Sequence, residues 1–109
     1  MRIEYESERV KKILTDFDKL YKIMGFDLEK KLRVTLNRLE ESSNFAEYLA
    51  LGIGNPHPLH NNLKGYYGVS LTANIRLIIK PAGETLSSNS FIVKGVCDYH
   101  GEKENWIVP

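Results

Sequence analysis

The sequence divides into a helix-patterned first half and a strand-patterned second half, which limits the fold to helices packed against a sheet. Between residues 8 and 24, apolar side chains recur at intervals of three and four, as on one face of an amphipathic helix: Val10, Ile13, Leu14, Phe17, Leu20, Tyr21 and Met24. Ser7 offers an N-cap before this stretch, and Gly25 offers a left-handed stop after it. We therefore predict one helix over about residues 8–24.

A second helix is expected directly after Gly25. Asp27 can cap it, and leucines repeat on one face while charged residues face outward, namely Leu28, Leu32, Leu36 and Leu39 against Glu29, Lys30, Lys31, Arg33 and Arg38. The short connection around Gly25 would make the two helices an antiparallel hairpin.

The second half contains three runs with the aromatic and β-branched content of strands, at residues 65–72, 74–80 and 91–99. Residues 2–6 alternate like a short additional strand, and residues 44–51 could form one or two helical turns. Short turns pair consecutive strands antiparallel, so we expect a meander with the helical hairpin packed on one face. The sequence therefore predicts an α+β fold in the order β-α-α-β-β-β, with the short helix after the hairpin.

Length and composition bound the class of protein. A chain of 109 residues, 42% of them hydrophobic, can bury one core, so we expect a single domain over 1–109. The net charge of +1 means that any attraction for nucleic acid must be local. Cys97, the only cysteine, excludes an intrachain disulfide, is expected to be a small buried apolar group, and fits a reducing, cytoplasmic location. No apolar run is long enough to span a membrane, so no membrane partner is expected.

All three histidines fall in two short segments, His57-Pro58-Leu59-His60 and Asp98-Tyr99-His100, and Arg76 lies between them in the sequence. Histidine can accept or donate a proton near neutral pH, and arginine has a permanent charge whose planar fork matches phosphate oxygens. On the predicted strand, Arg76 and Lys80 alternate with apolar residues. Arg76 should therefore project from the sheet face that the helices leave uncovered, which indicates a proton-transfer site on that face.

Plainer interpretations stay open for the same residues. His57 and His60 could simply hydrogen-bond a loop, and Arg76 could be a solvated residue or the partner in a cross-strand ion pair. His57, His60, Asp98 and His100 also offer enough donors for zinc. Because the first two lie in a predicted loop and no His-Glu-x-x-His pattern is present, we expect no metal.

Four motifs follow one another in a recognisable order: His57-Pro58-Leu59, Lys64-Gly65-Tyr66-Tyr67, Ala73-Asn74-Ile75-Arg76 and Asp98-Tyr99-His100. From about Pro56 to His100, this succession resembles the HigB branch of the RelE/ParE toxin superfamily, and the two predicted N-terminal helices agree with it in order and length. The resemblance implies a RelE-like fold and the toxin of a type II toxin–antitoxin system. The implied activity is ribosome-dependent, metal-free cleavage of messenger RNA without a cofactor. The implied partners are the ribosome, mRNA and a cognate antitoxin, commonly with a helix-turn-helix domain, which would form an oligomer with the toxin.

Carried over by position, His57, Arg76, Tyr99 and His100 match the family's functional residues. RNA cleavage without a metal needs a base, an acid and a cation for the charge that develops on the phosphate. His57 or His100 would serve as base or acid, and Arg76 would hold the phosphate. Tyr99 would orient the phosphate or stack a base, since the ordinary pKa of tyrosine, about 10, is too high for a base.

The remaining candidates would assist RNA binding. Many HigB-like toxins have a lysine directly after His-Pro-Leu, whereas this chain has His60 there and its lysine later, at Lys64. Tyr66 and Tyr67 should point to opposite faces of the sheet, so that the exposed one can stack an RNA base.

Two other functions remain as alternatives: a ParE-like toxin that inhibits DNA gyrase, and a catalytically inactive toxin-like domain that binds RNA or protein. A protein that only binds gyrase has no need of two potential proton-transfer groups, which favours the nuclease. Residues 101–109 extend past the point where HigB-like chains often stop. Within this extension, Trp106-Ile107-Val108 either packs on the domain edge or meets a partner, and we favour packing.

Overall fold

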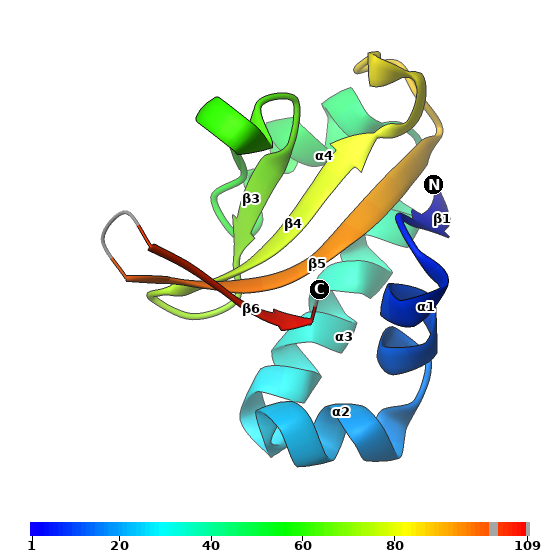
Figure 1. Ribbon diagram of the computed structural model, residues 1–109. Helices are drawn as coiled ribbons and strands as arrows, with labels where there is room; N and C mark the ends of the chain where they lie inside the picture. Colours follow the sequence, from blue (N-terminus) through cyan, green and yellow to red (C-terminus); the bar gives the residue numbers. More distant parts are fainter. Residues whose placement is uncertain (101–102, 109) are drawn as a thin grey trace.

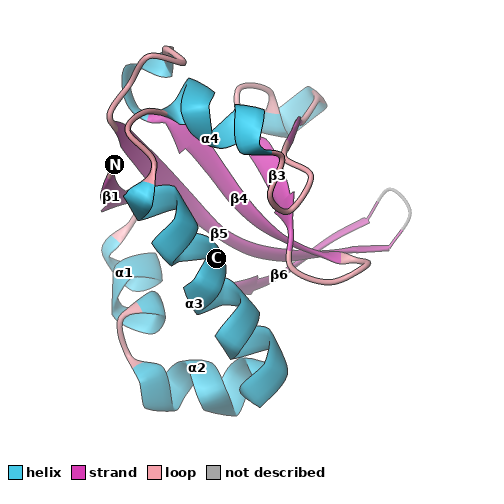
Figure 2. Ribbon diagram, turned by 180° about the vertical axis from the view of Figure 1, so that it is seen from behind, coloured by secondary structure: helices cyan, strands magenta, loops and turns pink. Residues whose placement is uncertain are grey.

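The computed structural model, which describes residues 1–100 and 103–108, has helices on one side of a twisted sheet (Figure 1). Seen from behind, α3 runs across the back of the sheet, with α1 and α2 beside it (Figure 2). The α+β class is confirmed. The elements are β1 (Arg2–Tyr5), α1 (Glu8–Leu14), α2 (Phe17–Met24), α3 (Phe26–Glu41), α4 (Phe45–Leu51), β2 (His57–Pro58), the 3-10 turn η1 (Asn61–Leu63), β3 (Tyr67–Ser70), β4 (Ile75–Pro81), the 3-10 turn η2 (Ala82–Glu84), β5 (Ser90–His100) and β6 (Lys103–Val108).

The predicted helix over residues 8–24 is in fact two helices, α1 and α2. The Thr15 hydroxyl donates to the Lys11 carbonyl at 2.6 Å, and the Asp16 side chain accepts from the Lys19 amide at 3.2 Å, so one helix ends where a new cap begins. The break also divides the apolar stripe: Phe17 and Tyr21 are 55% and 58% exposed instead of joining the core. A continuous hairpin of two helices was therefore the wrong expectation.

α3 begins two residues earlier than a cap at Asp27 would place it, at Phe26, because Gly25 turns the chain with a φ of 79°. Asp27 lies in the first turn and is not the N-cap. Glu29 was expected to face solvent but is buried, and it pairs with Arg33 one turn later. Leu32 and Leu39 are buried in the core as predicted.

The sheet is mixed, with the order β1-β5-β4-β3-β2, and β6 also pairs with β5. The meander β3-β4-β5 is antiparallel as expected. β1, however, pairs parallel with the first part of β5, from Arg2 opposite Ser90 to Tyr5 opposite Val93. The wholly antiparallel sheet was thus wrong, because a connection that passes through the helices brings β5 back in the direction of β1.

The two faces of the sheet are unequal. The helix side carries the main core, where Val69, Leu77 and Val96 meet Leu39 and Phe45. The other side, which we call the open face, has a small apolar layer outside that core, formed by the buried Leu63, Ile78 and Cys97. Cys97 is therefore buried as predicted, and burial, with the charges of Glu104 and Asp98 as further causes, raises the pKa of its thiol to about 11.

The C-terminal residues pack on the domain, as favoured above. β6 runs back along the second half of β5, and in Figure 1 its ribbon crosses that of β5. Val108 is fully buried in the main core. A Cβ placed on Gly95 would lie 1.9 Å from the Val108 carbonyl oxygen and 3.3 Å from Cε3 of Trp106. Only glycine permits β6 to approach this closely.

Gly95→Ala should therefore loosen β6. Because backbone and not a flexible side chain fills the space, we expect a loss of unfolding free energy of about 1–3 kcal/mol, the usual cost of overpacking. Thermal unfolding followed by the fluorescence of Trp106, the only tryptophan, would show a lower Tm and a more exposed indole. An unchanged Tm and emission spectrum would contradict the close approach of β6.

Candidate functional site

His57 and Arg76 both lie beside Gly68 on the open face. β2 pairs with β3 so that His57 lies opposite Gly68, and β4 places Arg76 on the same side. A Cβ on Gly68 would lie 3.6 Å from Cε1 of His57 and 3.8 Å from Cδ of Arg76. Both side chains are thus within ordinary contact distance of the same point above Gly68, where Cδ2 of Leu59 lies nearer still, at 3.3 Å. The predicted orientation of Arg76 is confirmed.

The turn between β3 and β4 holds the Arg76 guanidinium. Nη1 donates to the carbonyl oxygens of Thr72 and Ala73, at 3.2 and 3.0 Å. Among the described residues, no carboxylate pairs with Arg76, and no hydrogen bond engages Nε or Nη2. One nitrogen therefore fixes the orientation of the guanidinium, while two others can donate to an anion.

His57 has an oriented imidazole ring. Its Nδ1 lies 3.2 Å from the carbonyl oxygen of Asn55, which can only accept, so a hydrogen bond between them requires the tautomer with the proton on Nδ1. In the neutral ring this leaves the lone pair on Nε2. A half-buried histidine in this tautomer can accept a proton through Nε2.

Tyr99 is the third group on this part of the open face. Its backbone amide donates to the Asn74 carbonyl at 2.9 Å, which fastens β5 to the turn before Arg76. Burial, followed by the charges of Cys97 and Glu104, raises the pKa of Tyr99 to about 12, while the positive charge of Arg76 acts in the opposite direction. Tyr99 is therefore a hydrogen-bond donor at neutral pH.

Glu104 is a candidate site residue that was not predicted from the sequence. β6 pairs it directly with Tyr99, and the Asn62 side chain donates to it at 3.4 Å. A strand pattern over residues 103–108 would have placed Glu104 and Trp106 on one face. That pattern was not recognised, because the segment was treated only as a tail.

The residues predicted to assist RNA binding do not all lie beside His57 and Arg76. His60 and Lys64 are exposed at the two ends of η1, and no described contact joins either to His57 or Arg76. Tyr66 and Tyr67 point to opposite faces, as expected. Tyr67 packs on Phe45 on the helix side, with ring centroids 5.2 Å apart, so the structure does not bring it to the open face.

A cluster of charged and aromatic residues lies on the open face beside this site. We call it the lysine–aromatic cluster; it consists of Glu6, Tyr66, Lys80, Lys94 and Trp106. Lys94 Nζ donates to Glu6 at 2.8 Å, and the Tyr66 hydroxyl donates to the second Glu6 oxygen. The ammonium of Lys80 lies 4.8 Å from the Tyr66 ring centroid, and that of Lys94 lies 5.3 Å from Tyr66 and 5.5 Å from Trp106.

The electrostatics of this cluster favour an ionised Glu6. Partial burial raises the pKa of Glu6, but the hydrogen bonds from Lys94 and Tyr66 and the charges of Lys94 and Lys80 outweigh it, so the pKa is lowered. Burial and the bond to Glu6 raise the pKa of Tyr66 to about 12. The Glu6 carboxylate, directly after β1, thus links Tyr66, directly before β3, to Lys94 on β5.

Glu6→Gln should lower the Tm at neutral pH and have a smaller effect in acid. A carboxyl with a lowered pKa in the folded state stabilises it above the ordinary glutamate pKa, and this stabilisation is lost as the pH falls through the folded-state value. The difference in Tm between wild type and Glu6→Gln, measured from pH 7 down to about pH 3, should therefore shrink. A difference that stays constant would show that the charge of Glu6 is unimportant.

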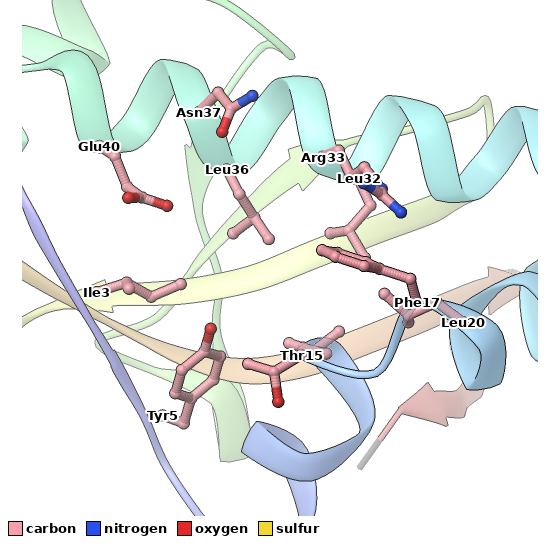
Figure 3. Close-up of a pocket in the computed structure, with 11 residues that line it drawn as sticks. Ile3, Tyr5, Thr15, Phe17, Leu20, Leu32, Arg33, Leu36, Asn37 and Glu40 are labelled. Atoms are coloured by element: carbon pink, nitrogen blue, oxygen red, sulfur yellow. The ribbon is translucent and has the colours of Figure 1, made fainter.

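A separate cavity lies on the helix side, between β1, the α1–α2 connection and α3 (Figure 3). Its volume is about 280 Å³, and Arg33 stacks over Phe17 at its edge, 3.6 Å from the ring centroid. None of the predicted site residues lines it.

The described residues offer neither a cluster of metal ligands nor a membrane-spanning helix. Within residues 1–100 and 103–108, no group of three or more histidine, cysteine, aspartate or glutamate residues could hold a metal ion. In the same part of the chain, no helix has both the length and the apolar character needed to cross a bilayer. The side chain of His100 lies outside the described residues, so its role, and its part in the zinc alternative, stay predictions.

Comparison with known proteins gives structural neighbours only. No family model and no curated protein sequence matches the chain. The YoeB–YefM complex of Staphylococcus aureus is similar with a TM-score of 0.60 and 20% identity, over 92% of this chain and 97% of the other. A YoeB/ParE toxin of Agrobacterium tumefaciens is similar with a TM-score of 0.61 and 17% identity, over 92% and 100%. The YoeB dimer of S. aureus has a TM-score of 0.56 and 22% identity, over 92% and 97%. The chain thus has the fold of these toxins.

Proposed function

We propose that this protein is the toxin of a type II toxin–antitoxin system in the RelE/ParE superfamily, and that it cleaves messenger RNA on the ribosome in a HigB-like manner. The observation that carries the proposal is that His57 and Arg76 both lie within 4 Å of one point above Gly68. A potential base and a phosphate-binding cation on one open face are what RNA cleavage without a metal requires.

The reaction would proceed by attack of a ribose 2′-hydroxyl on the adjacent phosphorus. Nε2 of His57 would accept the 2′-hydroxyl proton as the new O–P bond forms, and Nε and Nη2 of Arg76 would donate to the phosphate oxygens as negative charge develops. Tyr99, a phenol at neutral pH, would donate a further hydrogen bond. His100 is proposed to protonate the leaving 5′-oxygen, which yields a cyclic phosphate and a free 5′-hydroxyl.

A cognate antitoxin is the proposed partner, together with the ribosome and mRNA, in the cytoplasm. The similarity to a toxin solved in complex with YefM supports an antitoxin. A helix-turn-helix domain in that antitoxin, and the HigB-like subtype itself, rest on the motif resemblance, since the structural neighbours are YoeB and YoeB/ParE toxins. His60 and Lys64, at the ends of η1, are proposed to contact the RNA backbone.

The second candidate function is inhibition of DNA gyrase. The likeness to a YoeB/ParE toxin keeps this candidate open, whereas the oriented imidazole of His57 favours the nuclease. Brief expression of wild type and Arg76→Ala in cells, with transcript ends mapped in each, separates them. New mRNA ends that require Arg76 would support the nuclease. Growth arrest with trapped gyrase and no new ends would replace it with the gyrase inhibitor.

A further inference from the structure

We propose that the lysine–aromatic cluster is a second nucleotide-binding site, which holds unpaired bases and phosphates of the RNA strand next to the site at His57 and Arg76. The inference rests on the proposed function for the identity of the ligand. It adds Lys80, Lys94 and Trp106 to the RNA-binding surface, and it assigns to Glu6 a role in limiting RNA affinity.

The lysine–aromatic cluster lies on the same face of the sheet as Arg76. Arg76, Ile78 and Lys80 alternate on β4, so Lys80 lies on the same face as Arg76, roughly 13 Å along the strand. Lys94 is the extra residue of a β-bulge, since Ile78 pairs with Gly95 and Ile79 with Val93. Bulges redirect side chains, and this one places Lys94 and Gly95 on the open face in succession. One RNA strand can therefore contact both sites.

The side chains of the cluster have the chemistry of a site for single-stranded nucleic acid. The cluster brings two ammonium groups to one carboxylate and leaves an excess positive charge beside two aromatic rings. Side chains of Tyr66, Lys80, Lys94 and Trp106 are all half-exposed. Unpaired bases stack on aromatic rings while lysines bind the phosphates between them, which is the usual arrangement of sites for single-stranded nucleic acid.

Variants of Glu6 can show whether the cluster binds RNA or only stabilises the fold through the Glu6–Lys94 ion pair. The Glu6 carboxylate accepts a hydrogen bond from Lys94 Nζ at 2.8 Å. The carboxylate thus takes the position beside Lys94 that an RNA phosphate would occupy. Removal of either partner breaks the same ion pair and should lower stability. The effects on RNA affinity should have opposite signs, because Glu6 repels phosphate and Lys94 attracts it.

The experiment is equilibrium binding of a fluorescein-labelled, mixed-sequence single-stranded RNA to the 109-residue chain, with His57→Ala present throughout to prevent cleavage. Lys94→Gln should weaken binding severalfold and reduce the slope of log affinity against log salt by about 0.7. Glu6→Gln should strengthen binding and steepen that slope. Trp106→Leu, which keeps an apolar side chain over Gly95, should weaken binding about fivefold or more.

Two controls complete the design. A duplex RNA of the same length hides its base faces, so it should respond to Lys94→Gln but not to Trp106→Leu. A polyglutamate peptide tests the alternative that the cluster binds an acidic protein. The proposal is overturned if Glu6→Gln and Lys94→Gln move RNA affinity in the same direction, if neither moves it, or if only peptide binding responds. Loss of the nuclease proposal would be seen separately, in the transcript ends.

Discussion

Replacing His57 with asparagine should reduce RNA cleavage by roughly 10²–10⁴-fold, the usual contribution of a general base. The asparagine amide can still donate to the Asn55 carbonyl, as Nδ1 of His57 does at 3.2 Å, but it has no group in the position of Nε2. The loop before β3 should therefore keep its shape while proton transfer is lost. Single-turnover cleavage of ribosome-bound mRNA measures this effect directly.

His57→Gln is the matched control, because its amide reaches the position of Nε2 but is not basic. Both variants should be equally slow and should unfold at nearly the wild-type Tm, since His57 is only half-buried. Near-normal cleavage by His57→Gln would mean that His57 only hydrogen-bonds the substrate, and that the base is elsewhere.

The sequence predicted the elements that depend on local patterning. The periodicity of α3 and the β-branched runs of β3, β4 and β5 follow from burial of one face, so their positions were predictable. The break at Thr15 and Asp16 was not, because the apolar stripe continues across it and only the local hydrogen bonds of these two residues end the helix. The parallel pairing of β1 with β5 depends on how the whole chain returns, which local patterns do not determine.

The candidate site, too, was predictable where it depends on local sequence pattern and not where distant segments come together. Strand alternation was enough to place Arg76 on the open face, and the motif order suggested His57 as its neighbour. The roles of Gly68 and Gly95 could not be predicted, since they arise from side chains and backbone of distant segments that meet above them. The lysine–aromatic cluster was missed for the same reason: Glu6 and Lys94 are 88 residues apart in the sequence.

Arg76→Ala should reduce cleavage about 10²–10³-fold with little change in RNA affinity. Groups that meet charge as it develops act mainly on the transition state, and loss of one such donor has this magnitude. In the wild type, the Thr72 and Ala73 carbonyls hold Nη1 of Arg76. The guanidinium therefore needs no reorientation during the reaction. The measurement is the single-turnover rate at saturating mRNA, compared with RNA binding by the same variant.

Arg76→Lys separates charge from geometry. A lysine keeps the positive charge but cannot hold the turn and present two further donors at once, so we expect it to recover only a small part of the lost rate. Full recovery would reduce the role of Arg76 to that of a general cation. A weaker RNA affinity with an unchanged rate at saturating mRNA would instead assign Arg76 to ground-state binding, because an interaction that is uniform in both states does not accelerate the chemical step.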